Sequence, residues 1–136
     1  MKLAPNLPCA CHSGIKYKRC CRPIHRGRPA EGPDTLVRAR FSGFAYGLAG
    51  FVMGTTDPSG PVFEADAEAW ERSILSFSGG TLFTGLAILA VTHGAAEGRV
   101  TFRASLRQGG KDASFTEQSR FVRSGDAWLY HSGVLS

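Results

Sequence analysis

The chain has 136 residues, 43% of them hydrophobic and 20% charged, a composition typical of one globular domain with a short appendage. No apolar stretch approaches the roughly 20 residues that span a bilayer, and the first eight residues lack the apolar segment of a signal peptide, so we expect a cytoplasmic protein. The net charge of +5 is unevenly distributed, because residues 1–30 hold seven lysines and arginines and no acidic side chain.

The first predicted element is a metal-binding head. All four cysteines of the chain lie near the N-terminus, at Cys9, Cys11, Cys20 and Cys21. Four thiolates this close can enclose one Zn²⁺ at about 2.3 Å, and because they leave no position open for water, the zinc would be structural. A redox pair usually has the pattern Cys-x-x-Cys beside a βαβ unit, and the sequence has neither. We therefore predict a zinc-binding head over residues 1–22.

Other side chains of the head could modify this site. His12 or His25 could replace one sulfur, and Tyr17 is expected to pack over the metal, with an exposed tyrosine as the alternative. The basic residues nearest to the cysteines are Lys16, Lys18, Arg19 and Arg22. We expect them to form a partner-binding surface that attracts phosphate or an acidic protein face. The alternative is that these cations only neutralise the thiolate cluster.

A linker is expected between the head and the main domain. Residues 23–33 are rich in proline, glycine and arginine and show no periodicity, which is typical of a linker. The main domain, residues 34–136, should open with a helix that starts after this stretch. Pro33 suits the first helical position, and Asp34 suits the positive end of the helix.

Two further helices are expected before the predicted strands begin. A short helical piece is predicted over residues 48–53. A longer helix is predicted where apolar residues recur from Phe63 to Phe77 at spacings of four and three. The pair Gly79-Gly80 should end this helix.

From residue 82 onward the apolar period is two, which predicts strands. Residues 82–92 are almost continuously apolar, which indicates a strand covered on both faces. Residues 100–107 alternate between apolar and polar, which indicates a half-buried strand. Further strands are expected over 111–123 and 127–134, joined by hairpin-like connections. Helices followed by an antiparallel meander predict an α+β domain with its helices on one face of a curved sheet.

The segment from Pro8 to Cys21 resembles the SEC-C motif. This zinc motif is named for the C-terminal tail of the SecA translocation ATPase, where it contacts the chaperone SecB and the ribosome. The rest of the chain is similar to the YchJ family of bacterial proteins, which couple such a motif to a nuclear-transport-factor-2-like (NTF2-like) domain. The matching segments are 39–44, 85–89, 117–121 and 128–130. The resemblance implies a cone-shaped α+β domain behind a zinc head, and so widespread a fold does not specify a function.

The sequence departs from these patterns at two places. SEC-C motifs usually have proline at the position of Ala10 and glycine at that of His12. This difference keeps all four sulfurs, so the expected metal site is unaffected. The family's closing Tyr-Val-Asp-Gly is Tyr-His-Ser-Gly over residues 130–133 here. That change lies at the end of the sheet and weakens any transfer of a pocket from relatives.

Glu117 is the candidate pocket residue of the main domain. It lies in register with Phe115 and Phe121, so the strand face that buries these phenylalanines should also hold its carboxylate. A buried carboxylate needs a partner or a raised pKa, and such groups cluster in functional pockets. The alternative is a structural ion pair with an arginine, for which the candidates are Arg38, Arg40 and Arg103.

The last hairpin decides which residue of the final strand faces this site. A two-residue loop at Gly125-Asp126 places Phe121 opposite Tyr130. A three-residue loop favours Leu129 instead.

Three functions are compatible with these features. The first is a non-enzymatic interaction protein whose zinc head docks on ribosomal RNA, a ribosomal protein or a secretion chaperone, with the cone as a platform. The second is an enzyme or small-molecule binder that uses the cone around Glu117. The third is non-specific nucleic-acid binding through the basic head, which would weaken steeply with salt. We expect the first.

Overall fold

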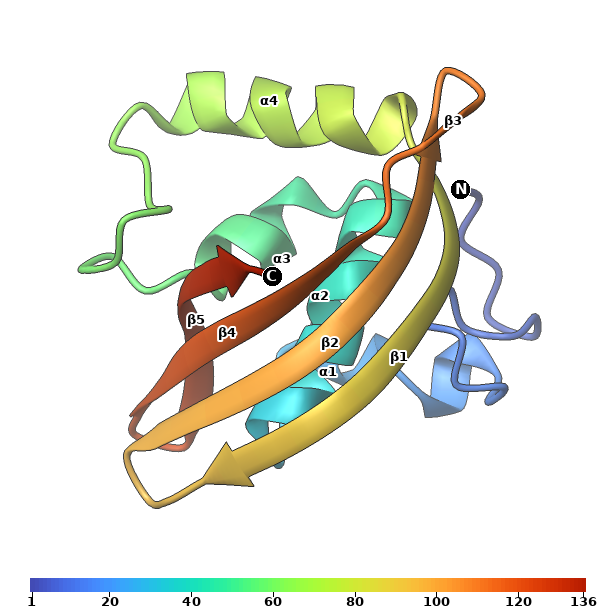
Figure 1. The fold of residues 1–136 in the computed structure, drawn as a ribbon. Coiled ribbons are helices and arrows are strands. Elements are labelled where there is room, and N and C mark those ends of the chain that lie inside the picture. The colour runs from blue at the N-terminus through green and yellow to red at the C-terminus, as the bar shows by residue number, and fades with distance from the viewer.

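The computed structural model describes residues 1–136 and has the predicted order of helices followed by strands (Figure 1). Its elements are η1 (Tyr17–Arg19), α1 (Arg22–His25), α2 (Pro33–Tyr46), α3 (Ala49–Gly54), α4 (Ala67–Gly79), β1 (Leu82–His93), β2 (Glu97–Gln108), β3 (Lys111–Asp112), β4 (Phe115–Ser124) and β5 (Ala127–Leu135). All strand pairs are antiparallel, and the sheet order is β1-β2-β4-β5, with β3 paired to β2. None of the helices combines the length and apolar character needed to cross a membrane.

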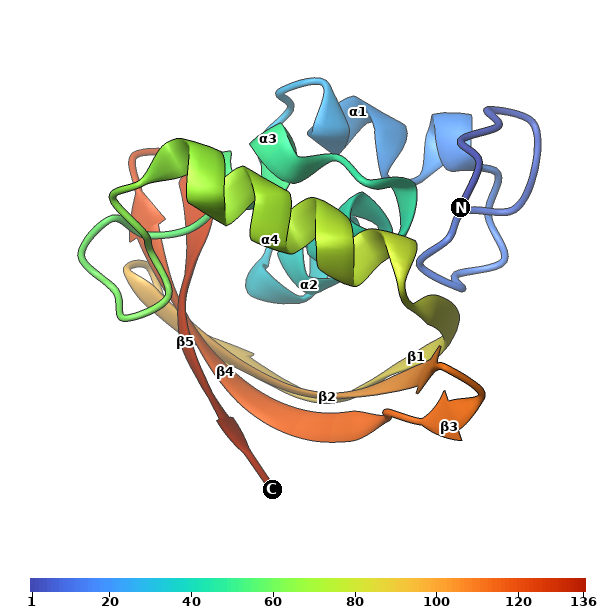
Figure 2. The same ribbon diagram turned by 90° about the horizontal axis from the view of Figure 1, so that it is seen from above.

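The sheet is strongly curved, and the helices lie on its concave face (Figure 2). Register shifts in the β1–β2 and β4–β5 pairs bend the strands, as β-bulges do. Helix α2 lies in the concavity, and α4 packs on α3 through Trp70 and Ile74. The prediction of an α+β cone with its helices on one face is confirmed.

The ends of the helices follow local capping chemistry. Helix α2 begins at Pro33, as predicted, and ends at Gly47, whose φ of 72° lies in the left-handed region that glycine adopts freely. Helix α4 begins later than the apolar spacing predicts. The Asp66 side chain accepts a hydrogen bond from the Ala69 N–H at 3.1 Å and caps the helix there. Phe63 therefore lies in the preceding loop.

The prediction that β1 is covered on both faces is wrong. β1 is an edge strand, and the helices cover only the concave side of the sheet. Leu82, Leu89 and Val91 are 67%, 59% and 37% exposed. A continuous apolar run therefore does not mark a central strand here.

The strand predicted over residues 111–123 is interrupted. Asp112 accepts a hydrogen bond from the Ser114 N–H at 2.9 Å, and the Ser114 hydroxyl accepts one from the Leu106 N–H at 3.0 Å. These side-chain bonds replace a regular ladder and separate β3 from β4. The final hairpin has the two-residue loop, because Phe121 pairs with Tyr130.

The segment expected to be a linker is partly helical. It contains most of α1, which begins at Arg22 and has Pro23 in its first turn, where proline is well tolerated. A single turn is too short to produce a periodic pattern. The head is also closely joined to the main domain, since Ala10 is buried in the same apolar cluster as Phe41 and Phe83.

Candidate functional site

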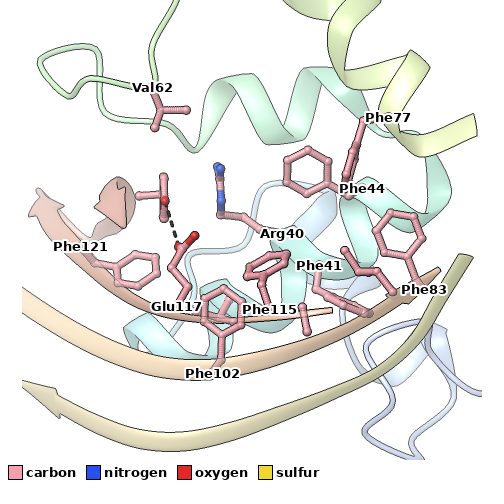
Figure 3. A pocket seen from close by; sticks show the side chains of 14 residues that line it. Arg40, Phe41, Phe44, Val62, Phe77, Phe83, Phe102, Phe115, Glu117 and Phe121 are labelled. Carbon is pink, nitrogen blue, oxygen red and sulfur yellow. Dashed lines mark hydrogen bonds between the residues drawn. The ribbon is translucent and has the colours of Figure 1, made fainter. Parts of the chain in front are cut away.

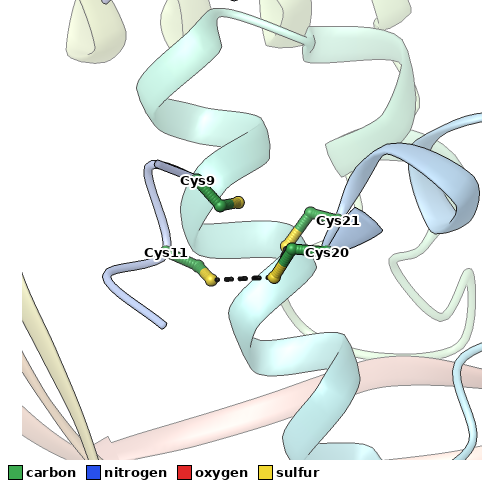
Figure 4. Close-up of side chains that lie close together, drawn as sticks. All are labelled: Cys9, Cys11, Cys20 and Cys21. Atoms are coloured by element: carbon green, nitrogen blue, oxygen red, sulfur yellow. Dashed lines mark hydrogen bonds between the residues drawn. The ribbon is translucent and has the colours of Figure 1, made fainter. Parts of the chain in front are cut away.

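The four cysteine side chains converge in the structure (Figure 4). Their sulfur atoms all lie within 4.8 Å of one another, with Cys11 and Cys20 at 3.5 Å and Cys20 and Cys21 at 3.9 Å. A tetrahedral site with bonds of about 2.3 Å requires sulfur atoms roughly 3.8 Å apart. The residues present therefore fit a metal ion with four sulfur ligands.

A tight loop brings the first two cysteines together. The Cys9 N–H donates to the Ile15 carbonyl at 2.8 Å, which closes the loop. Within it, His12 and Gly14 have φ of 62° and 83°. The left-handed conformation explains why glycine is usual at the position of His12. The η1 turn then returns the chain, and the Cys20 N–H donates to the Tyr17 carbonyl at 3.0 Å.

The electrostatics of the four thiols favour binding of a cation. Hydrogen bonds from Cys21 and Cys9 hold the pKa of Cys11 far below its usual range. The same bonds to Cys11 raise the pKa of Cys9 to about 11 and raise that of Cys21. One thiolate thus forms readily and discourages its neighbours from ionising. A divalent metal ion would supply the positive charge that four thiolates require.

Tyr17 packs against the cysteines as predicted, and it is only 2% exposed. Its hydroxyl lies 2.7 Å from His25 Nδ1, while His25 Nε2 lies 2.7 Å from the Ala39 carbonyl. A carbonyl only accepts, so Nε2 donates and Nδ1 accepts from Tyr17. His12 Nε2 contacts the Phe83 carbonyl at 2.9 Å. Both histidines have other partners, and neither belongs to the ligand cluster.

The head docks directly on α2. The Ala10 N–H donates to the Tyr46 hydroxyl at 3.0 Å, a bond that the proline usual at this position could not make. Arg38 donates to the Cys11 carbonyl at 3.2 Å. Ala39 is fully buried against the cysteines. The cysteine cluster therefore lies at the interface between the head and the main domain.

The basic residues of the head have no acidic partners. Lys16 and Arg19 are exposed, and Lys18 and Arg22 are half-buried. The one salt bridge of the structure joins Arg120 to Glu97 in the sheet. None of the seven cationic side chains of residues 1–30 forms an ion pair.

A second candidate site lies inside the cone (Figure 3). It is a cavity of ≈ 240 Å³ between α2 and the concave face of the sheet. Seven phenylalanines and Tyr130 make up most of its wall, and Arg40 and Glu117 are its only charged side chains. Glu117 thus faces a pocket, as its register predicts.

Hydrogen bonds hold the Glu117 carboxylate in place. Its Oε2 atom accepts from the Ser119 hydroxyl at 2.5 Å and from the Tyr130 hydroxyl at 3.0 Å. Burial, followed by the negative charge of Glu117, raises the pKa of Tyr130, so the phenol remains a donor. Gly133 lies beside this pair, and an added Cβ there would overlap the Glu117 carboxylate and displace it.

The predicted alternative of an ion pair to Glu117 is wrong. Arg38 and Arg103 bond elsewhere, and no Arg40 nitrogen lies within 4.0 Å of a Glu117 oxygen. Arg40 instead lies 4.6 Å above the Tyr130 ring centroid. Its position in the cavity follows from helical spacing, because it lies three residues after Val37, which lines the same cavity.

Comparisons with known proteins agree with this architecture. Residues 32–133 match the model "YchJ, middle NTF2-like domain", and residues 6–23 match the SEC-C motif. A UPF0225 protein of Deinococcus radiodurans is 34% identical over 128 residues, which cover 93% of this chain and 88% of the relative.

Two solved structures of SEC-C motif-containing proteins are also similar. The solution structure from Rhodopseudomonas palustris has a TM-score of 0.81 and 27% identity, covering 96% of this chain and 99% of that one. The crystal structure from Psychrobacter arcticus has a TM-score of 0.75 and 21% identity, covering 95% and 81%, and supports the fold alone. The family model, the sequence relative and the cysteine cluster lead to one assignment: the chain belongs to the YchJ family, with a SEC-C motif joined to its NTF2-like domain.

Proposed function

We propose that this protein is a docking protein whose head is held together by structural zinc and binds an acidic surface of another protein. The observation that carries the proposal is the cationic head: seven basic side chains in residues 1–30 and no ion pair among them. Unpaired cations on one region attract an anionic partner and speed its association.

Zinc is the metal that best suits the cysteine cluster. Soft thiolate ligands in tetrahedral geometry favour zinc or iron–sulfur chemistry among the biological metals. With Cys9, Cys11, Cys20 and Cys21 as the ligands, no coordination position is left for a substrate. The ion would shape the head and partly neutralise the thiolates, rather than react.

Exposed apolar side chains favour a protein partner over RNA. Leu7 and Ile15 are 60% and 50% exposed, and they belong to the same short ladder as Lys16. Apolar groups bordered by cations are typical of a protein–protein interface. Tyr17, the aromatic residue of the head that could stack on a base, is buried at the metal site.

Charge neutralisation tests this proposal without disturbing the metal. The test variant combines Lys16→Gln, Lys18→Gln and Arg19→Gln. The control variant removes the same charge from the exposed face of β2 at Arg99, Arg103 and Arg107, which are exposed in the structure. Both are used to capture partners from bacterial lysate with and without nuclease.

The proposal predicts a nuclease-resistant protein partner that the native and control proteins retain and the head variant binds about tenfold or more weakly. Retention by the head variant would contradict it, as would the absence of any partner that depends on the head. Loss after nuclease treatment would show that the head binds nucleic acid instead.

A further inference from the structure

The cavity of the cone offers a ligand site that is separate from the head. It has a rim at Val62, on the loop between α3 and α4, where this side chain is 39% exposed (Figure 3). Its volume is ≈ 240 Å³. An apolar protein cavity of about 150 Å³ binds one benzene ring. The space therefore suits a molecule of one to two rings.

Arg40 is a buried cation with unused hydrogen-bond donors. It is 8% exposed, and its Nη1 group donates to the Val52 carbonyl at 2.9 Å and to the hydroxyls of Thr55 and Thr56 at 2.9 and 3.1 Å. The N–H groups on Nε and Nη2 have no acceptor in the protein. Burial lowers the pKa of Arg40 to about 10, so the guanidinium keeps its charge at neutral pH. The fully enclosed polar side-chain atoms without a partner are Ser78 Oγ and Trp128 Nε1, so the Arg40 Nε and Nη2 groups keep some accessible surface.

Glu117 offers the complementary group in the same cavity. Both of its hydrogen bonds end on Oε2, so Oε1 is left as a free acceptor. Arg40 and Glu117 face the cavity together but do not form an ion pair. The cavity thus presents a donor and an acceptor of opposite charge, and aromatic rings enclose both.

We propose that the cavity binds an uncharged aromatic compound of one to two rings with an adjacent hydrogen-bond acceptor and donor, such as a lactam or a carboxamide. The carbonyl of the ligand would accept from Arg40, and its N–H would donate to Glu117. A charged ligand is disfavoured, because one of the two residues attracts it and the other repels it, so no net charge attraction offsets the loss of its hydration. Edge-to-face contacts with the phenylalanines of the wall favour aromatic rings in the ligand.

Four bicyclic probes of similar size separate the effects of hydrogen bonding, ligand charge and aromatic contact. They are isoquinolin-1(2H)-one as the neutral lactam, 2-naphthoate as the anion, 2-naphthylmethylammonium as the cation, and naphthalene as the apolar control. Binding to the full chain is followed by chemical-shift titration of the backbone amides. The expected order places the lactam about tenfold or more ahead of the other three, because hydrogen bonds to charged groups are strong. Equal affinities, a preference for an ion, or no binding of the lactam would overturn the proposal.

Variants then assign the roles of the two charged groups. Glu117→Gln removes the negative charge while keeping the shape, so the lactam should bind about tenfold more weakly, and 2-naphthoate should overtake it, because Arg40 becomes the only charge. Glu97→Gln, at an exposed carboxylate paired with Arg120, is the matched control and should change nothing. Unchanged selectivity in Glu117→Gln would contradict the proposal.

A cavity-filling variant covers the case in which Glu117→Gln unfolds. Ala104 is buried in the cavity wall. Ala104→Leu should abolish binding of all four probes while the amide spectrum stays folded. Undiminished binding to a folded Ala104→Leu protein would place the ligand elsewhere.

Discussion

Metal removal should destabilise the whole protein and not the head alone. The cysteine cluster is the interface between the head and α2, with Ala39 buried against the sulfurs and Ala10 bonded to Tyr46. Ligand binding stabilises the native state by about 4 kcal/mol when free metal is 1,000 times Kd. In a chain near 150 residues, each kcal/mol shifts the Tm by about 2–4 °C. Chelation should therefore lower the Tm by roughly 8–16 °C.

Tryptophan fluorescence is the assay, because Trp70 and Trp128 are the only tryptophans and both lie in the main domain. Thermal unfolding is followed with zinc, with a chelator, and after zinc is restored. We expect one unfolding transition, whose Tm falls when the chelator is added and recovers when zinc is restored. A tryptophan transition that stays in place while the metal leaves would refute the coupling between the head and the main domain.

Three substitutions test other contacts by denaturant unfolding. His12→Gly should leave the protein about 1 kcal/mol more stable than His12→Ala, because alanine keeps the cost of the left-handed φ; equal stabilities would argue against that backbone conformation. Tyr46→Phe should lose about 1–3 kcal/mol, because the Ala10 N–H is left without its acceptor, and a neutral result would mean that water replaces the bond. Gly133→Ala should lose about 1–3 kcal/mol by displacing the Glu117 carboxylate, whereas native stability would show that the carboxylate has room to move.

Much of the architecture was predictable because local chemistry and tertiary packing agree. The change of apolar period near residue 82 correctly divides helices from strands. The two-residue loop at Gly125-Asp126 is one of the two registers that the sequence allows, and it places Tyr130 opposite Phe121. Alternation along β4 places Glu117 on the inner face, where it lines the cavity.

Other features depend on tertiary contacts that the spacing of residues in the sequence does not reveal. An apolar run does not reveal whether a strand lies at an edge, so the exposure of Leu89 in β1 was missed. The partners of Arg40 lie on α3 and the turn after it. Their carbonyl and hydroxyl groups hold the guanidinium away from Glu117, and the ion pair expected from charge alone does not form. Such polar partners are set by packing of distant segments.

X-ray absorption at the zinc edge, combined with elemental analysis of gently purified protein, is the most direct test of the metal centre on which the docking head depends. The account predicts one zinc per chain with four sulfur ligands from Cys9, Cys11, Cys20 and Cys21 at about 2.3 Å. A nitrogen or oxygen ligand, iron in place of zinc, or fewer than about 0.5 zinc ions per chain would contradict a closed zinc site.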